Sequence, residues 1–215
     1  MAFSLRGVHV PHRKNTLDLP VVRMDPPGVV TIPMSMHIGA PARPVVQAGD
    51  LVCVGTKIGE AEAPVSSPIY SSVSGKVLKV RDFLLAGGGT TAAVVIESDG
   101  KMTPDAAICP PTVDSRESLI AAVRASGIVG LGGAGFPAHV KLNVDPSRIE
   151  HLIINGAECE PYVTSDTVTM TDRREDMAVA LETLKTHLGI KNIIIGIEAN
   201  KPKAIQSMKQ LMIET

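Results

Sequence analysis

A change of pattern near the middle of the chain constrains its fold more than any other feature. From Pro26 to about Ile96, short runs of β-forming residues alternate with Gly, Pro and Ser, which is typical of a small all-β sandwich or barrel. A proline-rich segment follows at residues 104–111, and after it the pattern becomes helix, strand, helix, strand, helix. The sequence therefore predicts an α+β protein with two domains, of which the second is α/β.

The predicted domain boundaries follow these changes of composition. They are an N-terminal extension at 1–27, a β domain at 28–103, a linker at 104–113 and an α/β domain at 114–215. In the α/β domain we expect a helix between Ser115 and Gly127, strands at 149–155 and 191–199, and helices at 167–188 and 202–214. Strands joined by a helix predict a parallel pair. Two parallel strands leave an unpaired edge, so we expect an incomplete, truncated α/β domain.

Composition excludes several classes of function. The chain has 21 basic and 22 acidic residues, a net charge of -1 and 2% aromatic residues, which argues against a nucleic-acid partner. No apolar run approaches the roughly 20 residues that span a bilayer, and the first residues lack a secretion signal, so we expect a cytoplasmic chain without membrane insertion. The three cysteines form no CxxC pair, and we expect no metal site within this chain.

The most informative motif is a glycine loop with four glycines within six residues: Gly130, Gly132, Gly133 and Gly135. Peptide N–H groups without side chains can surround an oxyanion, and Pro137 suits the first turn of a helix whose positive end would add to the field. Lys141, one turn along that helix, would neutralise a phosphate. Three of the glycines also satisfy GxGxxG, but no strand precedes them, and no Walker A motif is present. A tightly packed turn without a ligand stays open as an alternative.

An acidic loop, Asn155-Gly-Ala-Glu-Cys-Glu-Pro161, follows the strand expected at 149–155. Ligands of open α/β sheets bind beyond the carboxyl ends of strands, so this loop is a candidate site. Glu158 and Glu160 are two residues apart, and in an extended loop they face opposite ways and serve two ligands or two parts of one. A solvated acidic loop is the alternative.

At these two motifs the chain resembles the RnfC subunit of the Rnf complex, an ion-pumping ferredoxin:NAD oxidoreductase, and it is more distantly similar to the flavin-bearing subunit of respiratory complex I. The matching segments are GLGGAGFPAHVKL (130–142), LIINGAECEPYVTSD (152–166), GVHVPHRK (7–14), residues 32–61 and SSPIYSSVSGKV (66–77). The resemblance implies a β barrel-sandwich hybrid domain followed by part of an FMN/NADH-binding α/β domain. It covers nearly the whole chain.

The resemblance also implies the roles of individual residues. The FMN-binding positions are Gly130, Gly132, Gly133, Gly135, Lys141, Asn155 and Glu158, and the NADH-binding positions are Phe136 and Glu160. Two positions depart from the complex I relative, which has Arg in place of Leu131 and Asp in place of Ala157. A flavin links the two-electron chemistry of NADH to the one-electron chemistry of iron–sulfur clusters, so protein groups orient the cofactor and no catalytic side chain is expected.

The implied cofactors are FMN and NAD(H), with iron–sulfur clusters in a C-terminal region absent from this chain. The implied partners are the other subunits of a membrane electron-transport complex, NADH and, indirectly, ferredoxin, with the subunit peripheral on the inner face of the cell membrane. Alternatives are a related flavoprotein such as a corrin reductase, or a non-catalytic docking fragment. A biotinyl or lipoyl carrier role is disfavoured because residues 63–68, at the expected hairpin tip, contain no lysine.

Overall fold

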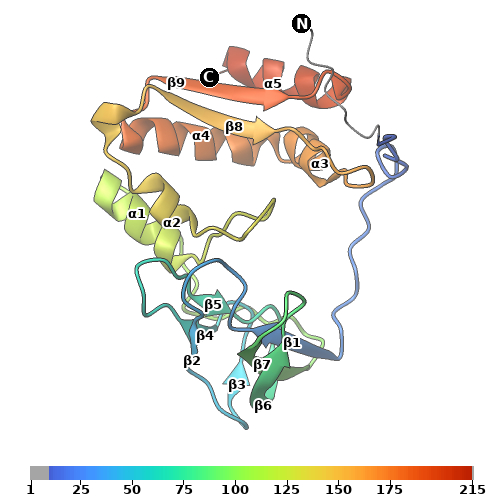
Figure 1. Ribbon diagram of the computed structural model, residues 1–215, viewed down its shortest axis with the longest axis vertical. Helices are drawn as coiled ribbons and strands as arrows, with labels where there is room; N and C mark the ends of the chain where they lie inside the picture. Colours follow the sequence, from blue (N-terminus) through green and yellow to red (C-terminus); the bar gives the residue numbers. More distant parts are fainter. Residues whose placement is uncertain (1–9, 215) are drawn as a thin grey trace, which may run out of the picture. The chain divides into compact units, whose positions relative to one another are not determined.

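The computed structural model describes residues 10–214 (Figure 1), so residues 1–9 of the predicted N-terminal extension lie outside the described part. The chain divides into two compact units. Residues 23–144 form what we call the β unit, and residues 10–22 together with 145–214 form the described part of the α/β unit. The predicted linker at 104–113 lies inside the β unit. The domain boundaries expected from sequence stay a prediction.

The β unit contains the short strands that the sequence predicted. They are β1 Val29–Pro33, β2 Arg43–Pro44, β3 Leu51–Val52, β4 Lys57–Glu60, β5 Ile69–Tyr70, β6 Gly75–Leu84 and β7 Thr90–Ser98. They form one sheet in the order β1-β7-β6-β3 and a second in the order β2-β4-β5, and their pairings are antiparallel. Met34, Ile58, Val77, Val94 and Ile96 are fully buried in a shared core. Because Val77 is buried between two exposed neighbours in β6, this strand covers the core with one face.

Two helices follow the sheets within the β unit. Helix α1 spans Arg116–Ala125 and starts at Ser115, whose side chain accepts from the amide of Ser118 while the Ser118 hydroxyl accepts from the amide of Ser115. The helix ends just before Gly127, as expected. Helix α2, Ala138–Leu142, has only five residues. The hydroxyl of Tyr70 in β5 donates a hydrogen bond to the carbonyl of Ala125, which attaches the end of α1 to the strands.

The α/β unit has the predicted parallel pair of strands. Its elements are the 3-10 helix η1 Pro146–Arg148, β8 His151–Gly156, α3 Ser165–Asp172, α4 Arg174–Leu188, β9 Asn192–Ile197 and α5 Pro202–Glu214. Strand β8 pairs with β9 in parallel from His151↔Asn192 to Gly156↔Ile197, with α4 running alongside (Figure 1). Met170, Ala204, Met208 and Leu211 from α3 and α5 form the core beside β9.

The single helix predicted over 167–188 is wrong. The structure has two helices, α3 and α4, separated at Arg173, where φ is -117° and ψ is 30°. The hydroxyl of Thr171 bonds back to the carbonyls of Thr167 and Val168, a contact that competes with regular helix geometry. The Ser207 hydroxyl of α5 donates to the carbonyl of Met170 at 2.7 Å. A tertiary partner therefore satisfies a carbonyl near the break, which periodicity alone does not reveal.

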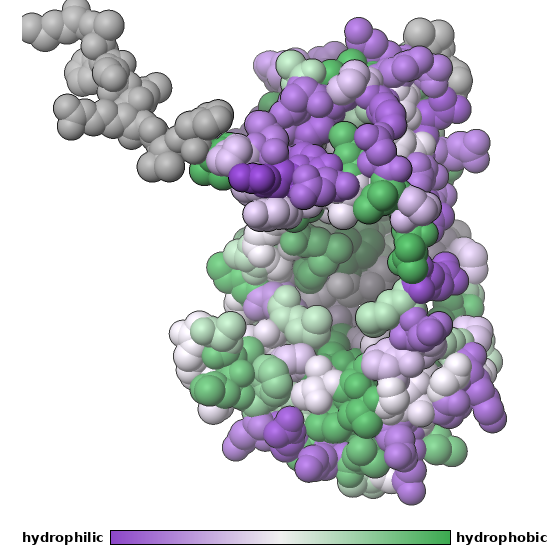
Figure 2. Space-filling model, turned by 90° about the vertical axis from the view of Figure 1, so that its right-hand side faces the viewer, coloured by the Kyte–Doolittle hydropathy of each residue, from purple (hydrophilic) through white to green (hydrophobic). Residues whose placement is uncertain are grey.

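The surface combines polar and apolar residues. On the face drawn in Figure 2, hydrophobic groups lie among hydrophilic ones, as on the surface of most folded proteins. Among the described residues, none of the helices has both the length and the apolar character needed to cross a bilayer.

Candidate functional site

The glycine loop of the β unit is closed at its base by the protein's own backbone. The amide of Gly130 donates to the carbonyl of Phe136 at 3.0 Å, and the amide of Ala138 donates to the carbonyl of Ile128 at 2.9 Å. Together with an antiparallel bridge between Val129 and Pro137, these bonds fix both ends of residues 130–136. The amide of Gly130 is thus occupied and does not face a ligand.

Between these closing hydrogen bonds, part of the backbone of the glycine loop is accessible to a ligand. Within residues 10–214 no hydrogen bond engages the amides of Leu131 and Gly132, and residues 131–134 form a turn. A Cβ atom added at Gly132 or Gly133 would meet nothing within 4 Å, and neither residue has a positive φ. Neither packing nor backbone conformation in the described structure therefore requires glycine at these two positions. Close approach of a ligand to the backbone gives a reason for both.

Gly135 is a glycine for a different reason. Its φ is +65°, and an added Cβ would lie 2.8 Å from the carbonyl oxygen of Met36. The amide of Ile38 donates to the carbonyl of Gly135 at 3.3 Å. The glycine loop is thus held against residues 36–38, and an open hollow of about 430 Å³ lies between them. Residues of the β domain therefore contribute one wall of the candidate site, which the sequence did not predict.

The other predicted residues of the β unit lie beside this loop. Phe136 is 36% exposed, and Lys141 is exposed on α2. No hydrogen bond or ion pair within the described part of the chain engages the Lys141 ammonium. Because α2 has only five residues, its dipole is small, and the charge of Lys141 is the main positive feature of this helix.

The acidic loop of the α/β unit begins where β8 ends, as predicted. The side-chain oxygen of Asn155 accepts a hydrogen bond from the amide of Ala157 at 3.1 Å and turns the chain out of the strand. Beyond this turn, Cys159 and Glu160 are exposed, whereas the side chain of Glu158 is 1% exposed. Of the two glutamates, Glu158 is therefore enclosed by the protein and Glu160 is exposed to solvent.

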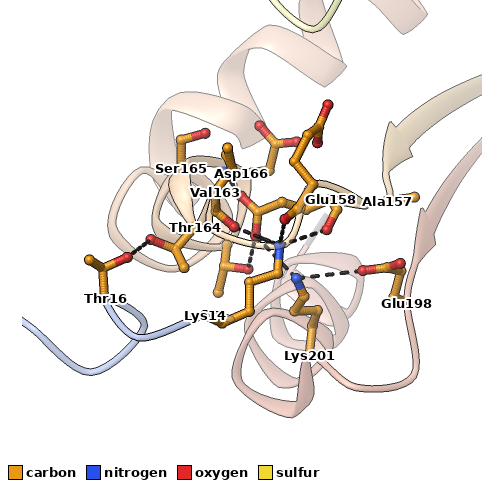
Figure 3. A network of polar contacts seen from close by, with 12 residues as sticks. Lys14, Thr16, Ala157, Glu158, Val163, Thr164, Ser165, Asp166, Glu198 and Lys201 are labelled. Carbon is orange, nitrogen blue, oxygen red and sulfur yellow. Dashed lines mark hydrogen bonds and ion pairs between the residues drawn. The ribbon is translucent and has the colours of Figure 1, made fainter. Parts of the chain in front are cut away.

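Both carboxylate oxygens of Glu158 are held by the protein (Figure 3). One accepts from the amide of Asp166 at 2.7 Å, and the other accepts from the Thr167 hydroxyl at 3.0 Å and from Lys201 Nζ at 3.1 Å. Burial opposes ionisation of Glu158, but these hydrogen bonds outweigh it and hold the pKa of the carboxyl below its ordinary value. The direct flavin contact expected of Glu158 stays a prediction, and the structure adds a role in holding the loop.

Lys201 and Asp166 complete the electrostatics of the acidic loop. Burial opposes the charge of Lys201, yet its bonds to Glu158 raise the pKa of the ammonium group. Burial, and then the nearby charges of Glu158 and Glu160, raise the pKa of Asp166. The loop thus places its carboxylates beside two cations, the buried Lys201 and the largely buried Lys14.

Sequence reasoning missed Lys14 and Lys201, although both contact the acidic loop. Lys14 is part of the GVHVPHRK segment that carries the resemblance, and this membership could have identified it as a candidate functional residue. Lys201 immediately precedes Pro202 at the start of α5, and nothing in the local pattern distinguishes it from a solvated lysine.

Two known domain families match the chain, and one of them contains both loops. Residues 3–101 match the RnfC barrel sandwich hybrid domain, and residues 123–215 match the Nuo51 FMN-binding domain, so the second match contains both loops. Over both segments the chain is similar to the RnfC family. The N-terminal match confirms the predicted barrel-sandwich architecture, and the second confirms the predicted FMN-binding type of the α/β part.

Individual relatives of the RnfC family agree with these matches. The chain is 42% identical over 207 residues to a subunit of the Na⁺-translocating ferredoxin:NAD⁺ oxidoreductase complex of Acetobacterium woodii, covering 94% of this chain and 47% of the relative. It is 41% identical over 210 residues to a subunit of the proton-translocating ferredoxin:NAD⁺ oxidoreductase complex of Clostridium ljungdahlii, covering 95% and 46%. It is 39% identical over 214 residues to a subunit of the ion-translocating oxidoreductase complex of Rhodobacter capsulatus, covering 96% and 41%. The chain thus spans about half the length of these curated relatives or somewhat less.

Proposed function

We propose that this chain forms part of a peripheral electron-transfer subunit of an ion-translocating ferredoxin:NAD oxidoreductase, and that it binds FMN and NADH. The observation that carries the proposal is the match of residues 123–215 to an FMN-binding domain, combined with the two open glycine positions inside that match. The subunit would work with other subunits on the inner face of the cell membrane. Its iron–sulfur clusters would lie outside residues 1–215.

The glycine loop fits the phosphate of a flavin mononucleotide. Its free amides at Leu131 and Gly132 are donors for phosphate oxygens, and the absence of Cβ atoms at Gly132 and Gly133 lets the backbone approach them. Lys141 would add a positive charge near the phosphate. Gly130 and Gly135 would shape the loop, since one closes its base and the other packs against residues 36–38.

The remaining predicted residues divide between flavin and nicotinamide. Phe136 is partly exposed and would offer its ring for stacking on the dinucleotide. Glu160 is exposed and would accept hydrogen bonds from ribose hydroxyls, and Asn155 would contact the flavin from the end of β8. A bound FMN would pass electrons between NADH and one-electron carriers. The protein's own part is to bind and orient both molecules.

Substituting Gly133 tests this proposal cleanly. Because an added Cβ meets nothing within 4 Å, Gly133→Val should fold normally and yet lose FMN through steric exclusion of the phosphate. Lys141→Ala should weaken FMN binding about tenfold, as expected for one charge-assisted hydrogen bond. Both are measured by flavin absorbance and by titration of full-length protein with FMN.

Lys101→Ala is a matched control, because Lys101 is an exposed lysine of the same unit far along the chain from the loop. It should retain the FMN content of the unmodified protein. Stoichiometric FMN in the double variant Gly133→Val, Lys141→Ala would contradict the site. A full-length protein that never binds FMN would contradict the function itself.

A further inference from the structure

Residues 10–22 belong to the α/β unit although more than 140 residues separate Lys14 from its partners in the acidic loop. The amide of Arg13 donates to the carbonyl of Pro161 at 2.9 Å, and the hydroxyls of Thr16 and Thr164 are 2.8 Å apart. This N-terminal segment therefore lies directly against the acidic loop. No family role assigned above to the acidic loop involves it.

The central contact of this segment is the ammonium group of Lys14 (Figure 3). Its Nζ donates to the main-chain carbonyls of Glu158 at 2.8 Å, Glu160 at 2.7 Å and Val163 at 2.6 Å. An ammonium has three N–H donors, so these three carbonyls satisfy it completely. The lysine side chain is only 10% exposed, and a carboxylate oxygen of Glu158 lies 3.8 Å away and adds attraction without a hydrogen bond.

A positive charge between these carbonyl oxygens stabilises the loop. Residues 157–164 contain neither helix nor strand, and their inward-facing carbonyls have no ladder partners. Converging carbonyl oxygens repel one another unless a positive group lies between them, as a bound metal cation does in a channel filter. Lys14 takes that place. It fixes three carbonyls of one loop from a distant part of the chain.

We propose that Lys14 is a positioning residue, a tethered cation that holds the acidic loop in the conformation that presents Glu160 to the nicotinamide nucleotide. The second half of this statement rests on the proposed function. The first half concerns only the order of the loop. The N-terminal segment then contributes to the nucleotide site by holding the acidic loop in place.

Three substitutions of Lys14 distinguish the effect of its charge from the effect of its packing. Lys14→Ala removes the atoms of propylammonium and leaves a space that this ion fits. Lys14→Met removes the charge but fills most of the space, so added propylammonium cannot enter. Lys14→Arg keeps the charge, but its flat guanidinium does not match three converging carbonyls. Lys203→Met is the matched control, because Lys203 pairs with Asp18 of the same segment and both side chains are more than half exposed.

The experiment measures amide hydrogen exchange of residues 157–166 in the full-length protein, with propylammonium or uncharged propanol added. We expect exchange about tenfold faster or more in Lys14→Ala, in proportion to the lost charge-assisted hydrogen bonds, and unchanged in Lys203→Met. Propylammonium should restore protection in Lys14→Ala and not in Lys14→Met, and propanol should restore neither. Unchanged exchange in Lys14→Ala, or equal rescue of both variants, would overturn the tethered cation.

The dissociation constant for NADH is measured in the same samples. It should rise about tenfold in Lys14→Ala and fall again with propylammonium. Faster loop exchange with an unchanged dissociation constant would overturn the positioning role. If the unmodified protein binds no NADH, the proposed function fails, while the exchange comparison still decides whether Lys14 holds the loop.

Discussion

Nζ of Lys201 lies 3.1 Å from Oε2 of Glu158, and neither side chain is more than 2% exposed. The two residues connect the start of α5 to the loop after β8, across 43 positions of sequence. A buried pair of this kind costs desolvation on both sides, so it contributes more to the geometry of the loop than to net stability. The acidic loop is thereby attached to the core of its own unit from one side and to the N-terminal segment from the other.

Removing one partner of this pair should destabilise the α/β unit strongly. In Lys201→Met the carboxylate of Glu158 stays buried without its nearest cation, which should cost about 3 kcal/mol. The midpoint of urea unfolding, followed by circular dichroism, measures the loss. Lys203→Met, which breaks only an exposed ion pair, should change stability by less than about 0.5 kcal/mol. Equal effects of the two substitutions would show that the buried pair has no special role.

The pKa of Glu158 predicts how stability depends on acidity. Burial opposes ionisation, but hydrogen bonds from Asp166, Lys201 and Thr167 hold the pKa below its ordinary 4.5, so the folded state favours the carboxylate. Its contribution is fully present above the unfolded pKa and is lost as the pH falls through the folded one. Unfolding measured at several pH values should therefore find Glu158→Gln less stable at neutral pH. The difference should shrink below pH 4.5, and a constant difference would argue against this ionised state.

Gly135 should contribute to the stability of the β unit through its backbone conformation and its packing. In Gly135→Ala the left-handed φ of +65° costs about 1–2 kcal/mol, and the added Cβ meets the carbonyl of Met36 at 2.8 Å. Thermal unfolding should therefore occur at a lower temperature. Gly87→Ala is the control, because Gly87 has open space around it and no positive φ. A Gly135→Ala protein as stable as the Gly87→Ala protein would refute the packing role.

His139 should make the β unit sensitive to mild acid. The residue is 6% exposed, its Nε2 lies 3.3 Å from the carbonyl oxygen of Pro64, and burial lowers the pKa of the imidazole below 6.5. The folded state then favours the neutral ring, so stability falls as the pH drops through 6.5 towards the folded pKa. His139→Leu should remove this part of the pH dependence, measured as the thermal midpoint at pH values on both sides of 6.5. Retention of the full dependence would assign it to another group.

Local patterns predicted most of the fold. The β-forming runs between Pro26 and Ile96 became the strands of the β unit, and the apolar segments at 149–155 and 191–199 became β8 and β9 in parallel. Helix α1 lies within the range expected for it, between Ser115 and Gly127. The helix predicted over 167–188 failed because its break at Arg173 depends on tertiary contacts, such as the one from Ser207. Periodicity averages over such a break and does not detect it.

The sequence predicted a nucleotide site at these loops but not which of their side chains are buried. The open glycines at 132 and 133 and the exposed Glu160 agree with a nucleotide site. Sequence spacing could not distinguish Glu158 from Glu160, since both are carboxylates in one loop. Burial distinguishes them, because one is enclosed by Asp166, Thr167 and Lys201 and the other faces solvent.

The sequence by itself determined the order of strands and helices and the chemical character of both loops, because turns, periodicity and side-chain type are local properties. Only the tertiary structure decided which charges are buried and which carbonyls a lysine would satisfy. Lys14 and Lys201 reach the acidic loop from 144 and 43 residues away, respectively. Contacts over such separations depend on how the chain packs, and the energy of a buried charge depends on every group around it.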